Sequence, residues 1–255
     1  MFRKMLSWSA ALLTLGYVAC VVFLDVEQRS LLYFPQYTHV EAAQTDFALR
    51  RGEVTLRGWV MNPGQSRALI YFGGNGDAVQ TMREDYAHWA PDRTVYLLAY
   101  RGYGASDGTP GEAALFGDAL ALYDDVRTRQ QDIAVVGRSL GSGVATYLAS
   151  QRSLQRLVLV TPYDSIARVA QGRFPIFPAA LMMQDKYESW RYAPAVHCPV
   201  LVIAAEEDRV VPAASTARLM RTFSPTPQYI RIDHSGHGNI VKDPAYAAAV
   251  ADFLR

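Results

Sequence analysis

Paired cysteines and an excess of charge of either sign are both missing from this sequence. Its 255 residues include two cysteines, Cys20 and Cys198, and neither lies in a Cys-x-x-Cys pattern, which argues against a disulfide framework and a redox or zinc site. The 25 basic and 24 acidic residues leave a formal net charge of +1, so the chain lacks the basic surface typical of nucleic-acid-binding proteins. No Gly-Lys-Ser or Gly-Lys-Thr occurs, which excludes a P-loop. Half of the residues are apolar, enough to bury one large core.

A long uncharged run does occur at the N-terminus, from Met5 to Leu24. Twenty helical residues span about 30 Å, which is the thickness of a bilayer's hydrocarbon core. Arg3 and Lys4 precede the run and Asp25 follows it. By the positive-inside rule, we expect residues 1–27 to be a single-pass signal anchor with its N-terminus in the cytoplasm. Residues 28–255 then form a domain on the extracytoplasmic (periplasmic) side.

Three other interpretations of this run remain open. Val18, Ala19 and Cys20 supply small residues near a possible cleavage point, as in a cleaved signal peptide. Cys20 is also where a lipoprotein signal would end. The run could instead be a buried N-terminal helix. The apolar residues that continue to Leu24 favour the uncleaved anchor.

Strand-like and helix-like segments alternate through the rest of the chain. Many strand segments are continuous apolar runs, which is typical of parallel strands covered on both faces. The alternation predicts an α/β fold with a mostly parallel, doubly wound sheet. The expected strands are 54–61, 68–72, 95–100, 133–137, 157–161, 200–205 and 229–233, and the expected helices are 77–89, 112–129, 139–151 and 244–254, the last capped by Asp243.

One insertion, at about residues 163–197, interrupts this alternation. Long insertions in compact domains are often lids or binding loops. It carries large apolar side chains that could line a substrate-binding site or, equally, pack into a small core of the lid's own: Phe174, Phe177, Leu181, Met182 and Met183.

Ser139 is the predicted nucleophile. It is the central residue of Gly137-Arg138-Ser139-Leu140-Gly141, a Gly-x-Ser-x-Gly pattern that is weak evidence by itself. Here a buried strand precedes the pattern and a helix follows it, which is the context of a nucleophile elbow. The alternative is a plain strand-to-helix turn with a capping serine.

A serine hydroxyl needs a general base, and that base needs a partner that orients it. His237 is the expected base because it follows the last strand in a glycine-flanked turn, with His234 as the alternative. Asp208 is the expected acid because it directly follows the strand 200–205, and the carboxyl ends of such strands carry active sites. Glu207, Asp164 and Asp233 are the other carboxylates in reach of these positions.

Acyl transfer also needs amide donors for the developing oxyanion. We expect one from the backbone N–H of Leu140 and a second from the loop after strand 68–72, where Asn75 is the first choice and Gly74 the next.

Together these motifs resemble the Bem46 and depalmitoylase-like group of α/β-hydrolase-domain proteins. Residues 100–110 read YRGYGASDGTP and residues 28–35 read QRSLLYFP, which are similar to that family's "YRGYGxSxGxP" loop and to its segment after the anchor. The resemblance covers nearly the whole chain. It implies an α/β-hydrolase fold with a short cap insertion and hydrolysis of esters or thioesters without a cofactor or metal. At the oxyanion strand the family has His-Gly-Asn, whereas this chain has Gly73-Gly74-Asn75.

The sequence therefore predicts a serine hydrolase that acts through an acyl-enzyme on a small or lipid-like acyl ester or thioester. A serine peptidase of the same fold is one alternative, since the same three residues cleave amides. A catalytically silent, membrane-anchored binding protein is the other.

Overall fold

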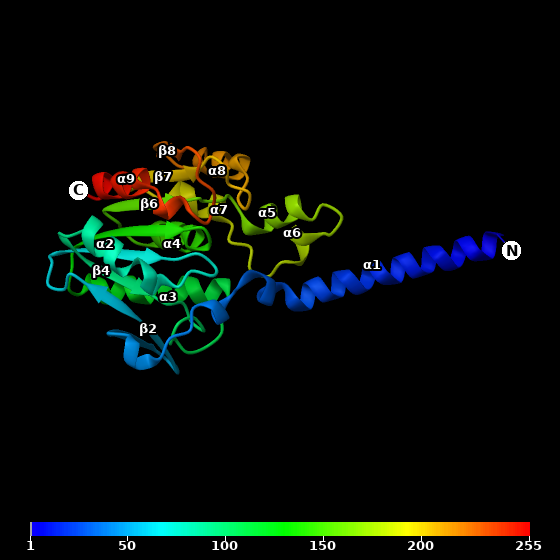
Figure 1. Ribbon diagram of the computed structural model, residues 1–255, viewed down its shortest axis with the longest axis horizontal. Coiled ribbons are helices and arrows are strands. Elements are labelled where there is room, and N and C mark those ends of the chain that lie inside the picture. The colour runs from blue at the N-terminus through cyan, green and yellow to red at the C-terminus, as the bar shows by residue number, and fades with distance from the viewer. Residues whose placement is uncertain (1) are drawn as a thin grey trace.

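A computed structural model describes residues 2–255, with side chains from Trp8 onward apart from Ala10. Its body is an eight-stranded sheet in the order β1-β2-β4-β3-β5-β6-β7-β8, with helices around it (Figure 1). The first strand pairs antiparallel with the second and the second with β4, and the other pairs are parallel. The strands are β1 Phe47–Arg51, β2 Val54–Met61, β3 Arg67–Phe72, β4 Arg93–Leu98, β5 Asp132–Arg138, β6 Arg156–Val160, β7 Val200–Ala205 and β8 Gln228–Ile232.

Among the helices of the body, α2 packs against α9 to form one pair, and α3 packs against α4 to form another. The insertion between β6 and β7 forms a cap with three short α-helices, and α8 follows β7. The α-helices are α1 Phe2–Leu32, α2 Arg83–Trp89, α3 Glu112–Arg127, α4 Leu140–Gln151, α5 Ile166–Arg173, α6 Ala179–Met182, α7 Ser189–Tyr192, α8 Ala213–Met220 and α9 Pro244–Leu254. Short 3-10 turns are η1 Pro35–Tyr37, η2 Ala42–Gln44, η3 Val79–Met82, η4 Ala193–Ala195 and η5 Ile240–Lys242.

The predicted fold class is confirmed, and all seven expected strands are present within a few residues of the expected bounds. The sequence analysis missed β1, an edge strand in which exposed and half-buried residues alternate and which ends in Arg50 and Arg51. Charged edge strands lack the continuous apolar run that marks a central strand. The helix expected at 77–89 is shorter: the 3-10 turn η3 begins at Val79 and α2 only at Arg83, while Asp77 makes the contacts described below.

Helix α1 projects from the body (Figure 1) and extends past residue 27, the expected end of the anchor, to Leu32. The segment Ala11–Tyr37, which comprises most of α1 and the turn after it, is long and apolar enough to cross a membrane, and none of its most apolar window is buried in the protein. This exposure excludes the buried-helix interpretation. The side chains of Arg3 and Lys4, on which the predicted orientation depends, lie outside the described part of the chain.

The C-terminal end of α1 is tied to the body through the buried carboxylate of Asp185 in the cap. Its Oδ2 accepts hydrogen bonds from Arg29 Nε at 3.1 Å and from the Tyr33 hydroxyl at 3.0 Å. Its Oδ1 accepts from the backbone N–H of Glu112 at 3.0 Å, the first residue of α3, where a negative charge is favoured by the helix dipole. One carboxylate thus joins α1, the cap and α3.

We predict that Asp185→Ala lowers the free energy of unfolding of the detergent-solubilised full-length protein by about 2–3 kcal/mol, because the buried Tyr33 hydroxyl, the half-buried Glu112 N–H and the Arg29 guanidinium all lose an acceptor. Urea unfolding followed by tryptophan fluorescence measures this. The matched control is Asp124→Ala, which removes an ion pair with Arg152 between half-exposed side chains and should cost under about 1 kcal/mol. Equal losses in the two variants would show that Asp185 does not hold α1 to the body.

Candidate active site

Ser139 sits in a sharp turn between β5 and α4, with φ 50° and ψ −118°. A non-glycine residue at positive φ is strained, and such strain persists only where the surroundings enforce it. A Cβ on Gly137 would lie 2.4 Å from the carbonyl oxygen of Gly141, and a Cβ on Gly141 would lie 2.2 Å from that of Phe72. Both flanking positions therefore require glycine. The strand–turn–helix context expected from the sequence is present.

The structure brings the three predicted residues together. His237 Nε2 lies 2.9 Å from Ser139 Oγ, and His237 Nδ1 lies 2.8 Å from Asp208 Oδ2. Because a carboxylate only accepts, Nδ1 carries the proton and the neutral ring presents Nε2 as an acceptor to the serine hydroxyl. Asp208 Oδ1 accepts from the backbone N–H groups of Val210 and Val211, each at 2.8 Å, which fixes the carboxylate for its contact with the imidazole.

The alternatives for base and acid lie elsewhere. His234 is exposed, and its backbone N–H donates to Glu206. Glu207 is exposed at the start of the loop that carries Asp208. Asp233 is exposed and pairs with Arg231.

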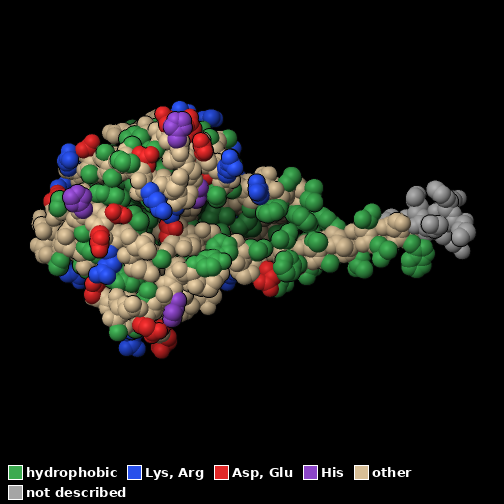
Figure 2. Space-filling view, viewed as in Figure 1, with side chains coloured by type: hydrophobic (Ala, Val, Ile, Leu, Met, Phe, Trp, Pro, Cys, Tyr) green, Lys and Arg blue, Asp and Glu red, His purple; other side chains and the backbone are tan. Residues whose placement is uncertain are grey.

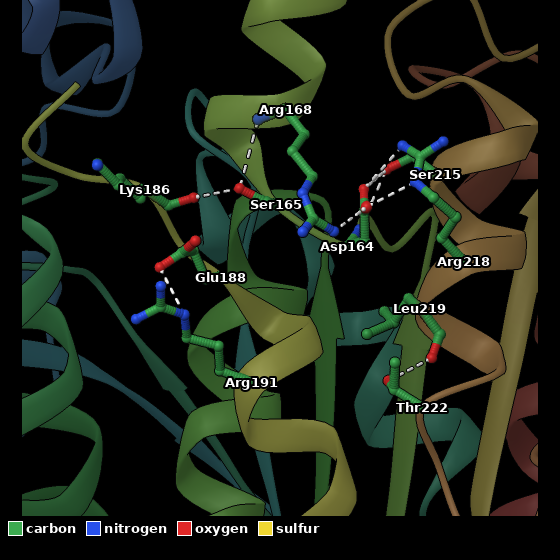
Figure 3. A network of polar contacts seen from close by, with 10 residues as sticks. All are labelled: Asp164, Ser165, Arg168, Lys186, Glu188, Arg191, Ser215, Arg218, Leu219 and Thr222. Carbon is green, nitrogen blue, oxygen red and sulfur yellow. Dashed lines mark hydrogen bonds and ion pairs between the residues drawn. The ribbon is translucent and has the colours of Figure 1, made fainter. Parts of the chain in front are cut away.

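Asp164, which follows β6, is fully buried but serves a different network (Figure 3). Its carboxylate accepts from Arg218 at 2.7 and 3.1 Å, from Arg168 at 3.1 Å and from Ser215 at 2.5 Å. Burial acts to raise the pKa of this carboxyl, but the hydrogen bonds from Arg218, Ser215 and Arg168 outweigh it and hold the pKa below its ordinary value. Asp164 thus fastens α5 of the cap to α8, and Asp208 partners the histidine.

Of the proposed oxyanion donors, Leu140 and Asn75 have backbone N–H groups without an acceptor among the described residues. Leu140 is the first residue of α4, and the leading amides of a helix have no partner within it. Gly74 is different, because its N–H donates to Asp77 Oδ2 at 2.7 Å. That amide is already committed, so the expectation for Gly74 is not supported by the geometry.

Residues 73–76 follow β3 and include Asn75, the proposed oxyanion donor; we call them the oxyanion loop. The loop of residues 100–110 supports them through two hydrogen bonds. The Tyr100 hydroxyl donates to the carbonyl of Gly73 at 2.8 Å, and the Tyr103 hydroxyl donates to that of Asn75 at 2.7 Å. The Asn75 side chain donates to the carbonyl of Leu32 at the end of α1. A Cβ on Gly73 would lie 2.7 Å from Val79, so this chain has no room there for the family's histidine.

Arg138 and Asp77 form a further network that the sequence analysis missed. Arg138, the residue before Ser139, makes an ion pair with Asp77, whose carboxylate also holds Gly74. The Arg138 guanidinium donates to the carbonyl of His237 at 3.0 Å as well. The buried Arg138 guanidinium thus links the end of β5, the loop after β3 and the loop after β8 that carries His237. The only sequence signal was an arginine at the variable position of the Gly-x-Ser-x-Gly pattern.

An apolar groove separates the cap from α1. Of the side chains expected to bind substrate, Phe174, Phe177 and Met182 line it together with Met183. Leu181 lies outside this set, with 82% of its surface exposed. We call this feature the α1–cap groove; its remaining lining residues are Leu24, Gln28, Leu31, Leu32, Ile166, Ala170 and Ala179.

Comparison with known proteins shows the family of this chain. Residues 70–239 match the serine hydrolase (FSH1) family. A protein of Mycobacterium tuberculosis, Rv2307c, is 33% identical over 235 residues, which cover 86% of this chain and 83% of that protein. Protein bem46 of Schizosaccharomyces pombe is 26% identical over 284 residues, covering 99% and 92% of the two chains.

A third relative carries an activity in its name. The lysophosphatidylserine lipase ABHD12 of Danio rerio is 30% identical over 192 residues, which cover 63% of this chain and 50% of the lipase. Among solved structures, a hydrolase from Pseudomonas aeruginosa PA01 superposes with a TM-score of 0.67 at 20% identity, covering 84% of this chain and 99% of that one. The resemblance to Bem46-type α/β-hydrolases is therefore confirmed, and the chain belongs to the serine hydrolase (FSH1) family.

Proposed function

We propose that this protein hydrolyses carboxylic esters or thioesters through an acyl-enzyme on Ser139. The observation that carries the proposal is the pair of contacts at His237, 2.9 Å to the Ser139 hydroxyl and 2.8 Å to the Asp208 carboxylate. A serine is a weak nucleophile until an adjacent base can take its proton, and that base is effective when a third group orients it.

In the first half of the reaction, Ser139 Oγ attacks the substrate carbonyl carbon while His237 Nε2 takes the hydroxyl proton. Asp208 stabilises the imidazolium without accepting that proton. The former carbonyl oxygen becomes negatively charged and is met by the N–H groups of Leu140 and Asn75. His237 then donates its proton to the leaving alcohol or thiol as the bond to it breaks, and Ser139 is left acylated.

In the second half, water replaces the leaving group. His237 removes a proton from the water as its oxygen attacks the acyl carbon, and returns that proton to Ser139 Oγ as the acyl bond breaks. The products are a carboxylic acid and the free serine. All the proton transfers use one imidazole, so a fixed orientation of His237 serves both halves.

The α1–cap groove supports an acyl chain as the part of the substrate that is recognised. Its lining is almost wholly aliphatic, aromatic or thioether, which suits a flexible hydrocarbon chain. Its wall reaches Leu32, whose carbonyl binds the Asn75 side chain of the oxyanion loop. The lipase activity in the name of one relative points toward the same lipid-like substrate class.

We further propose that α1 is a single-pass anchor that holds the hydrolase domain on the extracytoplasmic side of the membrane. Support comes from its length, its apolar composition and its exposure. Figure 2 shows hydrophobic side chains gathered along the projecting helix and on the cap beside its base.

The first test measures hydrolysis of p-nitrophenyl esters of increasing chain length by the full-length protein in detergent. We expect Ser139→Ala and His237→Ala each to lower kcat by at least about 1,000-fold, because the nucleophile or its base is lost. A p-nitroanilide peptide, assayed in parallel, should be cleaved far more slowly than the esters. Preference for the anilide would favour the peptidase, and full activity in Ser139→Ala would contradict the proposal.

A second test addresses the groove with two adjacent residues. Met182→Ala removes part of the groove wall and should lower kcat/KM about 10-fold for long-chain esters, as expected for the loss of one buried side-chain contact. Acetate esters, too short to reach the groove, should be unaffected. The matched control is Leu181→Ala, whose side chain lies outside the groove, so it should change kcat/KM for neither the long-chain nor the acetate esters. Equal chain-length profiles in all three proteins would argue against an acyl groove.

A third test separates the two carboxylates. Asp208→Asn should slow labelling of Ser139 by a fluorophosphonate probe about 10,000-fold, because the imidazole loses its partner. Asp164→Asn should label at the wild-type rate while the protein is folded. The opposite ranking would mean that Asp164 orients the base.

Asp164→Asn should instead show itself in stability. The pKa of Asp164 is lowered by folding, so its stabilising contribution is fully present above the unfolded value of about 3.9 and is lost as the pH falls through the folded value. The difference in free energy of unfolding between wild type and Asp164→Asn should therefore be large at pH 7 and shrink below about pH 4.

A further inference from the structure

The cap carries an uncharged segment beside the projecting helix. Residues 174–183, here called the cap tip, read FPIFPAALMM and lie between Arg173 and Gln184. Three of its large side chains face outward, with exposed fractions of 49% for Phe174, 71% for Ile176 and 82% for Leu181. Soluble surfaces rarely expose apolar side chains in such a cluster, and where they do the cluster usually marks a binding surface.

The cap tip is in direct contact with α1. The ring of Tyr17 stacks on that of Phe177, with centroids 5.6 Å apart and an interplanar angle of 2°. The Tyr17 hydroxyl donates to the carbonyl of Ile176 at 2.9 Å. These contacts fix the level of the cap tip along the helix.

That level lies within the apolar part of the helix. Tyr17 precedes Asp25, the first charged residue after the uncharged run, by eight residues, which corresponds to about 12 Å of helix. Each headgroup layer is only about 5–8 Å deep, outside a hydrocarbon core of about 30 Å. If α1 spans the membrane, residues packed against Tyr17 lie below the headgroups, among the acyl chains.

The backbone of the cap tip is suited to that environment, where an unpaired polar group is costly. Pro175 and Pro178 have no N–H to satisfy. Every other backbone N–H of the cap tip has an acceptor within the described structure except that of Ile176. Gln171 of α5 contributes on both sides: its Oε1 accepts from Ala180, and its Nε2 donates to the carbonyl of Phe177 at 2.9 Å.

We infer that the cap tip is a second membrane contact, inserted into the same leaflet as the end of α1 nearest the domain. Its partner is the acyl region of a lipid bilayer, and exposed Arg173 at its border suits the headgroup phosphates. The inference rests on the proposed anchoring by α1 and is independent of the chemistry at Ser139. The protein would thus hold its cap at a fixed depth in the bilayer.

The test places an environment-sensitive nitrobenzoxadiazole probe at one thiol of the full-length protein in phosphatidylcholine–phosphatidylglycerol vesicles. Cys198→Ala removes a half-buried thiol, and native Cys20, exposed on α1, then reports on the anchor. In a Cys20→Ala, Cys198→Ala background, Ile176→Cys reports on the cap tip and Leu181→Cys provides a second position. Ala248→Cys is the control, at an exposed position of α9, which lies at the end of the body opposite α1 (Figure 1).

We expect the probes at Cys20, Ile176→Cys and Leu181→Cys to emit at shorter wavelength than the probe at Ala248→Cys. They should lose emission to lipids with spin-labelled acyl chains and resist quenching by aqueous iodide, with the opposite result at Ala248→Cys. If the probe at Cys20 is quenched by the lipids but both cap probes are quenched by iodide, the inference is overturned while the proposed anchoring by α1 is supported. Iodide quenching at Cys20 as well would overturn both. Ester hydrolysis by the same samples reports separately on the proposed function.

Discussion

The strained turn at Ser139 is the constraint on which the site depends. A serine at φ 50° costs about 1–3 kcal/mol, and it is held there because β5 and α4 are both anchored in the core. Gly137 packs against Gly141, and Gly141 against Phe72, so closely that neither glycine could carry a side chain. This packing keeps the turn between β5 and α4 tight. The turn places the hydroxyl at the carboxyl edge of the parallel strands, next to the backbone amide of Leu140, which has no acceptor among the described residues.

A second requirement is that three separate loops keep their positions relative to that hydroxyl. Arg138 does this by pairing with Asp77 and by donating to the carbonyl of His237. Asp77 in turn holds the Gly74 amide. Because the ion pair is largely buried, losing one member would leave an uncompensated charge inside the protein. The machinery is therefore positioned by one residue next to the nucleophile in sequence, which has no contact with substrate in the proposed mechanism.

Much of this architecture follows from the sequence, and the parts that do not have a common cause. Continuous apolar runs identify the central strands, and the order of motifs along the chain identifies Ser139 and His237. Asp164 and Asp208 both follow a parallel strand, and only tertiary contacts show which of them meets the histidine. Asp77 fits a helical pattern but forms an ion pair with Arg138 at the end of β5. Leu181 is as apolar as the residues that line the α1–cap groove, yet α6 directs its side chain outward. The residue types alone do not reveal in which direction a side chain points or which distant residue it binds.

Helix α1 is also linked to the site, since its end reaches the oxyanion loop through Leu32 and the cap through Asp185. The proposed mechanism depends above all on Ser139 being the activated nucleophile. Peptide mass mapping after treatment of the full-length protein with a fluorophosphonate tests this most directly. We expect a single phosphonyl adduct, on the peptide that contains Ser139, and its loss in His237→Ala. An adduct on another residue, or one that persists unchanged in His237→Ala, would contradict it.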